Sequence, residues 1–417
     1  MDAEAWIREY ALLALRVNRQ VVADAGGTVL IYRGPDAWRA GVEDEEPVPP
    51  GRLAEDAEAL LDRPPFPPER ARYLAAQVRA LRAVAGRLAG DERPLTEYAH
   101  DCLGVPADPV PEEVFEEAHA RLDRALPPGA GTLAERLHAW QAAHTLRATG
   151  VPPGPPRAWG KAGDVPGLLD LAVAECRRRT SELVALPDGD QVDCQIVSVA
   201  HFRAAGHYAG GVRSTLFVNG DLPFNLADLL YVVSHEVYPG HIAESLLKEV
   251  ELVERRGRID QRVRFMLAPS FVISEGLGLH AEEIAFPGDA AQAWLADHVL
   301  RPRGIGPDGS DLAAIHRTQN ALFGAWANAS LLAAEGRDDA EVAAYLTRWA
   351  LLSEAETATA LGSLRASGMA LYVLGYFHGW RLLDAWLDAP DRADRVRRLL
   401  TEQLLPEDVT LPGQRSG

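Results

Sequence analysis

The chain has 417 residues, a formal net charge of −18 at pH 7 and hydrophobic residues at 47% of its positions. An acidic surface repels phosphate groups, so we expect neither nucleic acid nor an anionic membrane surface among the partners. The three cysteines form no CxxC pair, which argues against a disulfide framework and a cysteine zinc cluster. The start of the chain is acidic and no apolar run approaches the ~18–20 residues of a membrane span, so the sequence predicts a cytoplasmic protein.

Alanine, leucine, arginine and glutamate dominate the composition, which predicts a mostly α-helical fold. In the first half of the chain, apolar spacing predicts helices over 3–18, 69–90, 131–148 and 166–185, with loops at 41–50 and 63–68. β-Branched runs predict short strands at 27–34, 191–202 and 213–220. Helices are then predicted to follow one another over 225–236, 241–256, 270–285, 311–334, 339–351, 354–366 and 369–387.

Prolines are dense in the string GVPPGPPR at 150–157, and we expect a domain boundary or a long connection over 150–165. This divides the chain into an N-terminal helical region, residues 1–160, and a second region, residues 161–417. The second region carries the motifs at 235–283 and the helices that continue to about residue 387.

His235, Glu236 and His241 directly follow an apolar helical stretch. Imidazole binds Zn²⁺, and a nearby carboxylate can take a proton from the zinc-bound water. The histidines are spaced i and i+6, which places them about 120° apart on a regular helix. Pro239-Gly240 lies between them, and a bulge absorbing two residues would return both imidazoles to one face. Alternatively, one helix ends at Glu236, a second begins at His241, and the histidines are incidental.

A third ligand is predicted on the helix over 270–286, which has Ser270 as its expected N-cap. Glu275 on this helix would complete a His₂Glu zinc site. Gly276 and Gly278 each cost the helix ~1 kcal/mol relative to alanine, which is easier to understand if another backbone or a substrate approaches there. The alternative is an ordinary surface glutamate on an amphipathic helix.

The strings HEVYPGH (235–241) and SEGLGLHAEE (274–283) resemble the paired signatures HExxPGHH and EGxAxYxE of the bacterial family called domain of unknown function 885. That family is related to helical zinc metallopeptidases of the gluzincin type. The resemblance implies a helical zinc-metallopeptidase-like catalytic region over 161–417, with a small β element beside the cleft. It implies His235, His241 and Glu275 as zinc ligands and Glu236 as the general base.

A further match lies in MALYVLGYFHGW (369–380), which resembles a YxxG segment of the same family. It implies Tyr372 as a donor to the oxyanion, and Tyr376, four residues on, is the substitute. Helix packing is the alternative for both tyrosines. The chain departs from the family pattern at Ile242, Leu277 and His280, which leaves the substrate open; His280 is a candidate to bind substrate or a structural histidine.

In the related peptidases an edge strand beside the metal helix pairs with an extended substrate, and the strand at 213–220 is the candidate here. Arg213, Arg317 and Arg381 are candidates to hold a substrate carboxylate, since guanidinium binds carboxylates well. An ordinary ion pair is the alternative for each arginine. The string GHYAGG, which contains His207 and Tyr208, is expected to form a glycine-rich turn.

These residues predict a zinc-dependent hydrolase of peptide or related amide bonds. A metal-dependent small-molecule amidase or biosynthetic tailoring enzyme is the first alternative, and a non-catalytic helical scaffold is the second. Imidazole and carboxylate also suit Mn²⁺ and Fe²⁺, so the ligands do not select zinc alone. The substrate, exo or endo cleavage, and the oligomeric state are left open.

Overall fold

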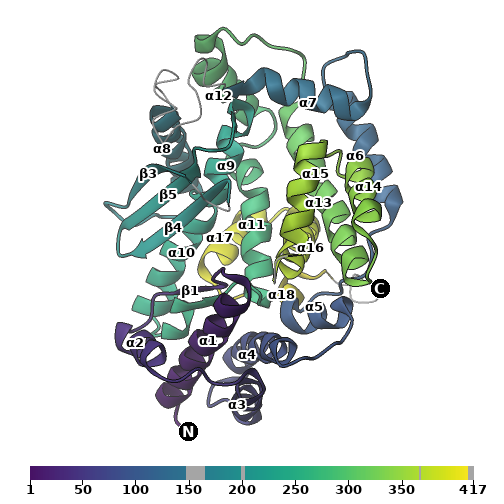
Figure 1. Cartoon of the computed structure of the whole chain (residues 1–417). Helices are drawn as coiled ribbons and strands as arrows, with labels where there is room; N and C mark the ends of the chain where they lie inside the picture. The colour runs from purple at the N-terminus through teal and green to yellow at the C-terminus, as the bar shows by residue number, and fades with distance from the viewer. Residues whose placement is uncertain (147–164, 199–201, 366–367, 412–417) are drawn as a thin grey trace.

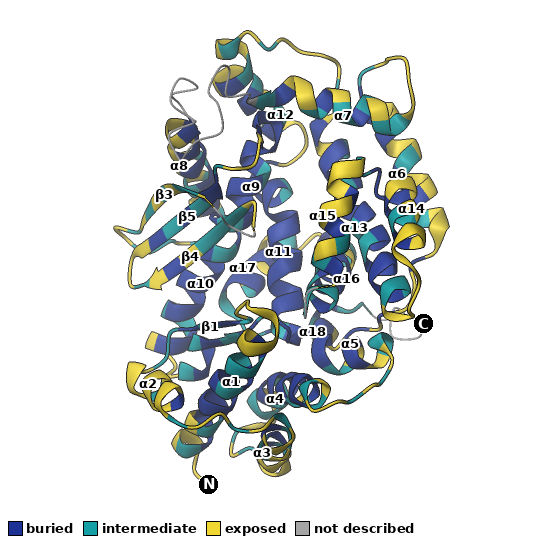
Figure 2. Cartoon of the chain, viewed as in Figure 1, coloured by how far each residue is buried: buried dark blue, intermediate teal, exposed yellow. Residues whose placement is uncertain are grey.

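The computed structural model describes residues 1–146, 165–198, 202–365 and 368–411, and it confirms the predicted mostly α-helical fold. Helices surround a central buried helix, α11 (Pro269–Ala285), and a small sheet lies to one side of it (Figure 1, Figure 2). The predicted boundary at 150–165 falls almost wholly outside the described residues. Within them, no helix combines the length and apolar character that a membrane crossing needs.

The chain begins with a long helix, α1 (Ala3–Ala25), whose ends are set by local capping. The Asp2 side chain accepts the backbone N–H of Ala5, and Gly26 closes the helix with a φ of 76°. The apolar face of α1 packs on the three helices that follow it, so the N-terminal part of the chain forms a helical layer at one end of the molecule (Figure 1). The further helices of this layer are α2 (Asp36–Asp44), α3 (Pro50–Asp62) and α4 (Pro68–Leu88).

The loop predicted at 41–50 is partly wrong, because α2 continues to Asp44 and α3 begins at Pro50. The loop prediction depends on proline as a loop signal. Proline also suits the first position of a helix, because its missing N–H costs nothing there and its fixed φ matches the helix. Pro68 has the same role at the start of α4.

A second group of helices packs around α13 (Leu312–Ala334) and α16 (Met369–Leu387) on the other side of α11 (Figure 1). The structure agrees with the predicted helix at 369–387 at both ends. The remaining helices of this group are α5 (Leu95–Leu103), α6 (Glu112–Ala125), α7 (Leu133–His144), α14 (Asp339–Trp349) and α15 (Glu354–Leu364).

The sheet contains β3 (Gln191–Val197), β4 (Ala204–Gly210) and β5 (Arg213–Asn219) in the order β3-β5-β4. β5 runs parallel to β3 and antiparallel to β4. Two predictions are therefore wrong. The strand at 213–220 is central and not an edge, and GHYAGG is not a turn because His207 and Tyr208 lie within the edge strand β4.

Two short strand pairs join distant parts of the chain. β1 (Leu30–Tyr32) pairs antiparallel with β7 (Val263–Phe265), and β2 (Thr145–Leu146) pairs with β6 (Phe224–Asn225). Each pair contains one strand from the first 160 residues and one from the rest. β7 leads directly into α11, so β1 lies close to the centre of the molecule.

Glycines allow α11 and α16 to pack at backbone contact. A Cβ on Gly276 would lie 2.5 Å from the carbonyl oxygen of Gly379, and a Cβ on Gly379 would lie 2.2 Å from that of Val272. The expected close approach of another backbone at Gly276 is therefore found. Ser270 is not the N-cap of α11, because the helix begins at Pro269.

The remaining elements complete the shell around α11. Two helices that carry the candidate ligands lie between the sheet and α11; they are α9 (Leu229–Glu236) and α10 (His241–Lys248). A π-helical turn (Glu249–Glu254) extends α10, and a 3₁₀ turn (Leu226–Asp228) precedes α9. The others are α8 (Val165–Leu183), α12 (Ala290–Leu295), α17 (Arg392–Thr401), α18 (Pro406–Val409), 3₁₀ turns at Ile259–Arg262 and Arg301–Arg303, and a π-helical turn at Ala296–Leu300.

Candidate metal centre

The two candidate histidine ligands lie on either side of a break between helices. α9 ends at Glu236 and α10 begins at His241, so the predicted bulge inside one continuous helix is wrong. The backbone follows the alternative given for this segment, in which a Pro-Gly turn separates two helices. Gly240 is required in this turn, because a Cβ there would lie 1.8 Å from the carbonyl oxygen of His235.

Two backbone hydrogen bonds carry the chain across the break. The N–H of Gly240 donates to the carbonyl of Ser234, and the N–H of Ala243 donates to the carbonyl of Val237, both at 2.9 Å. Each bond spans six residues, whereas an α-helical bond spans four. The turn thus accommodates two additional residues, and His241 returns to the side of the preceding histidine.

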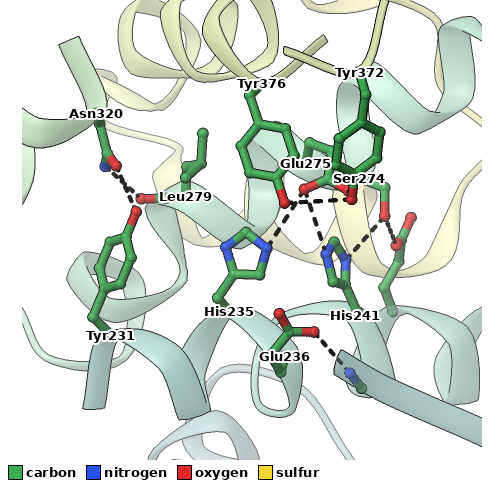
Figure 3. A network of polar contacts seen from close by, with 12 residues as sticks. Tyr231, His235, Glu236, His241, Ser274, Glu275, Leu279, Asn320, Tyr372 and Tyr376 are labelled. Carbon is green, nitrogen blue, oxygen red and sulfur yellow. Dashed lines mark hydrogen bonds and ion pairs between the residues drawn. The ribbon is translucent and has the colours of Figure 1, made fainter. Parts of the chain in front are cut away.

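Three ligand atoms converge between α9, α10 and α11 (Figure 3). Nε2 of His235 lies 3.5 Å from Oε2 of Glu275, and Nε2 of His241 lies 3.6 Å from the same oxygen. Atoms held ~2.0–2.1 Å from a tetrahedral Zn²⁺ lie about 3.3–3.4 Å apart. The observed separations therefore suit one cation between the three side chains.

The shared oxygen of Glu275 is unsatisfied by protein atoms. Glu275 is 1% exposed, and its Oε2 has no hydrogen-bond partner among the described residues. Its other oxygen accepts the hydroxyl of Tyr372 at 3.1 Å. A buried carboxylate oxygen without a partner is costly, so this donor set fits a metal ion better than an ordinary core position.

The charges of the cluster are strongly coupled. Burial acts to raise the pKa of Glu275, but His241 and His235 hold that pKa well below its usual range. Burial acts to lower the pKa of His241, whereas the Glu275 carboxylate raises it to about 9. Without a metal, His241 is protonated at neutral pH, and a binding cation displaces this proton.

Glu236 lies beside the two imidazoles and is held by the edge strand of the sheet (Figure 3). Its Oε2 accepts the backbone N–H of Gly206 at 2.8 Å. A Cβ at Gly206 would lie 2.2 Å from the carbonyl oxygen of Glu236, so glycine permits this approach. One carboxylate oxygen is thereby oriented, and the other has no hydrogen-bond partner in the part of the chain that the structure describes.

Tyr372 and Tyr376 both reach the cluster from α16 (Figure 3). Their hydroxyl oxygens lie 3.4 Å apart, and the Tyr376 ring stacks on His235 with ring centroids 6.1 Å apart. Burial and the nearby Glu275 charge raise the pKa of both phenols well above the usual value, so both remain hydrogen-bond donors. Because Tyr372 donates its one proton to Glu275, Tyr376 is the donor in the 3.4 Å contact between the two hydroxyls.

A buried polar network supports His241 from behind. Nδ1 of His241 lies 3.2 Å from the hydroxyl of Ser274, which also accepts a hydrogen bond from Arg264 at 2.8 Å. The same hydroxyl donates to Glu244, which Lys248 binds at 2.8 Å. Because its proton goes to Glu244, Ser274 accepts from Nδ1–H and leaves Nε2 free for a metal. Sequence analysis missed this network, although Ser274 directly precedes Glu275 in the second motif.

His235 is accommodated by a glycine of the second motif. A Cβ on Gly278 would lie 2.6 Å from Cε1 of the His235 ring. The glycine that weakens α11 thus makes room for a ligand, and the approaching group is an imidazole of α9.

A second buried charge cluster lies between α9, α11 and α13. Nδ1 of His316 lies 2.7 Å from Oε2 of Glu282, and Nε2 lies 3.3 Å from Oδ1 of Asp228. Arg203 reaches the other oxygen of Asp228 at 3.1 Å. The two ring nitrogens point to different carboxylates, so the imidazole bridges them and the cluster is an ion triad.

This triad lies about two helical turns from the metal ligands along the chain segments that carry them. Asp228 precedes His235 by seven residues, and Glu282 follows Glu275 by seven, which is about two turns of helix. His316 therefore connects the start of α9 to α11, the two helices that also carry the ligands His235 and Glu275. We expect it to hold the two ligand-bearing segments together when no metal is bound.

Replacing His316 with glutamine leaves Asp228 and Glu282 buried with less cationic compensation, so we expect a loss of about 3–5 kcal/mol in unfolding free energy at pH 7. Burial acts to lower the pKa of His316, but Glu282 and Asp228 raise it to about 10. The stabilisation is fully present below the unfolded pKa of ~6.5 and is lost as pH rises towards 10.

Urea denaturation at pH 7, 8 and 9 checks this expectation. The difference in unfolding free energy between the wild type and His316→Gln should shrink by up to ~1.4 kcal/mol per pH unit. The exposed His100→Gln provides the control and should match the wild type. A difference that stays constant over this range would contradict a protonated His316.

The structure does not bring His280 into the metal cluster. Its Nε2 lies 3.0 Å from the carbonyl oxygen of Trp380, and the two rings stack between α11 and α16. This contact is the one expected of a structural histidine, which is the alternative given for His280. Ile242 and Leu277, the other departures from the family pattern, are 1% and 0% exposed and lie in the hydrophobic core.

None of the three candidate arginines is placed at the cluster. Arg213 and Arg381 are exposed, and Arg213 begins β5 at its turn with β4. Arg317 binds Asp384 and lies 3.4 Å from Glu283, which is the ordinary ion pairing given as its alternative.

Comparison with known proteins shows a likeness of fold to a solved structure and no more. Neither a protein-family model nor a curated protein matches the chain. A solved structure named "putative lipoprotein from Colwellia psychrerythraea" is 14% identical with a TM-score of 0.51, and the match covers 86% of this chain and 65% of that one. A "putative lipoprotein of unknown function from Shewanella oneidensis" is also 14% identical, with a TM-score of 0.43 and coverages of 94% and 68%. The chain thus spans less than two thirds of the Colwellia protein, and that likeness concerns the fold alone.

Proposed function

We propose that this protein is a metal-dependent hydrolase of peptide or related amide bonds, related to the domain of unknown function 885 family. The observation that carries the proposal is the convergence of His235, His241 and Glu275 on one point, with Oε2 of Glu275 left without a protein partner. Zn²⁺ is the proposed ion, and the same ligands suit Mn²⁺ or Fe²⁺.

A metal bound by these ligands supplies a Lewis acid that polarises the scissile carbonyl and makes a water more acidic. Glu236 acts as the general base. Its free oxygen accepts a proton from the attacking water and then passes that proton to the leaving amine. The hydrogen bond from Gly206 keeps the carboxylate oriented during both transfers.

The chain offers further groups around the reacting carbonyl. Tyr376 donates a hydrogen bond to the developing oxyanion, while Tyr372 holds the Glu275 ligand in place. The edge strand β4 offers backbone groups to an extended substrate, because among the described strands it pairs with β5 on one side and with none on the other. Substrate alignment thus falls to β4 and not, as the sequence predicted, to the strand at 213–220.

A small-molecule amidase or tailoring enzyme would use the same residues. The departures from the family pattern at Ile242, Leu277 and His280 suggested this alternative, and all three are buried packing positions. No feature of the described residues favours it over a peptide hydrolase. One assay covers both, because a substrate panel can contain dipeptides and N-acyl amides side by side.

The test begins with protein purified without added metal. We expect about one equivalent of Zn²⁺, Mn²⁺ or Fe²⁺ by elemental mass spectrometry, and amine release from a panel of dipeptides and N-acyl amides. Removal of the metal with a chelator should abolish amine release, and readdition should restore it. A protein that neither contains nor takes up a stoichiometric metal would be the helical scaffold and not a hydrolase.

A further inference from the structure

A partly buried network of ion pairs beneath the metal centre joins more cations than carboxylates. Glu244 binds Lys248 and Arg264, and Glu249 binds Arg262 with Arg33 nearby. These ion pairs thus join four cations to two carboxylates. An excess of positive charge inside a chain of net charge −18 suggests that an anion from outside the chain completes the network.

Arg33 is the cation of the network whose contact with a carboxylate is the longest. Oε1 of Glu249 accepts two hydrogen bonds from Arg262, whereas Nη2 of Arg33 lies 3.8 Å from Oε2, beyond hydrogen-bond distance. Among the described residues, Nε and Nη2 of Arg33 have no hydrogen-bond partner, and neither has Oε2 of Glu249. The guanidinium rests over the Tyr208 ring, 4.8 Å from its centroid.

Burial, together with the nearby Arg264, lowers the pKa of Arg33 to about 10. The group is therefore still a cation at neutral pH. A buried cation with so little compensation is costly, and a carboxylate beside it would recover that cost.

Arg33 lines a cavity of about 630 Å³ between α1, β1, α2 and the edge strand β4. Arg19 and Arg39 also line it, and both donate to backbone carbonyls without an ion pair in the described part of the chain. Glu43 is the carboxylate among its lining residues, and apolar side chains from α1, α2 and β1 complete the wall. We call this cavity the Arg33 pocket.

The Arg33 pocket is bounded by both elements that support the metal centre. His207 in its wall directly follows Gly206, which binds the general base Glu236. On the other side, Ile31 of β1 pairs with Arg264 of β7, the residue that donates to Ser274 behind His241. The pocket and the metal centre are thus connected through β4 and through the pairing of β1 with β7.

We propose that the Arg33 pocket binds a carboxylate of the substrate, so that the enzyme prefers amides whose body is apolar and which carry a free carboxylate. That the bound carboxylate belongs to a substrate rests on the proposed function, whereas the predicted binding of a carboxylate does not. Sequence analysis expected such a guanidinium at Arg213, Arg317 or Arg381, whereas the structure offers Arg33 for this role.

Binding is tested first on metal-free full-length protein, where the catalytic metal cannot hold the carboxylate. N-Acetylleucine should bind measurably by isothermal titration calorimetry, and N-acetylleucinamide should bind about 10–100-fold more weakly, because it lacks the charge. Arg33→Gln should remove the difference, Arg33→Lys should retain part of it, and the exposed Arg8→Gln should leave it unchanged. Equal binding of the acid and the amide by the wild type would overturn the proposal.

A stability measurement guards against loss of the fold. Because Glu249 keeps Arg262, Arg33→Gln should unfold at a denaturant concentration no lower than that of the wild type. A strongly destabilised Arg33→Gln would instead make Arg33 a structural ion-pair partner and would contradict the proposal.

Turnover assays then distinguish a C-terminal carboxylate from a side-chain carboxylate. They also distinguish the hydrolase proposal from the proposal for the Arg33 pocket. Comparing the hydrolysis of dipeptides that have a free C-terminus with that of their amides tests for a terminal carboxylate. Comparing matched substrates that contain glutamate or glutamine tests for a side-chain carboxylate. Selective binding without hydrolysis of any amide would retain the pocket and reject the hydrolase. Hydrolysis by the wild type without any preference for acids would retain the hydrolase and reject the pocket.

Discussion

Replacing Glu236 with glutamine is expected to lower kcat by about 10²–10⁴-fold while leaving the metal content unchanged. Glutamine has nearly the shape of glutamate and can still accept the hydrogen bond from Gly206, but it cannot take the proton of the attacking water. Glu236 is also separate from the convergent ligand atoms, so the metal should remain bound. Amine release and elemental mass spectrometry on the same preparation measure both properties.

Glu283→Gln is the matched control, since Glu283 is a half-buried glutamate on the helix that carries Glu275 and pairs there with Arg317 and Arg392. It should retain the wild-type kcat and metal content. Full turnover by Glu236→Gln would remove the general base from the proposed mechanism. Loss of metal from this variant would instead place Glu236 among the ligands.

Removal of the His241 imidazole should weaken metal binding more than any change behind it. His241→Ala deletes one of three ligands, whereas Ser274→Ala deletes only the hydroxyl that orients His241. Changes of the second kind typically cost 10–100-fold in metal affinity, so we expect about that loss for Ser274→Ala and a larger one for His241→Ala. Competition with a chromogenic chelator at fixed pH measures both dissociation constants.

Two controls make this comparison specific. The exposed His100→Gln should bind metal as the wild type does. Ser274→Thr keeps a hydroxyl and should recover part of the affinity lost in Ser274→Ala. If His241→Ala and the wild type bind Zn²⁺ equally tightly, the convergent cluster is not the metal site.

Local patterns in the sequence were sufficient for most helices and for the choice of candidate ligands. Helix formation depends on residues three and four apart, so periodicity placed α16 at both of its ends. Prolines misled the prediction at α3, because the same residue that ends one helix can begin another. The glycines of the second motif correctly indicated close contacts, but only the structure identifies the approaching groups as the Gly379 backbone and the His235 ring.

The sequence by itself determined the helical fold class and the three residue types that can hold a metal, because propensity and motif spacing are local properties. Only the tertiary structure decided that His241 returns to the side of His235, that β4 and not β5 is the edge, and that two nitrogens of Arg33 lack a hydrogen-bond partner among the described residues. Each of these depends on contacts between residues far apart in the chain. Hydrogen-bond partners and burial are set by those contacts, and neighbouring residues in the sequence do not specify them.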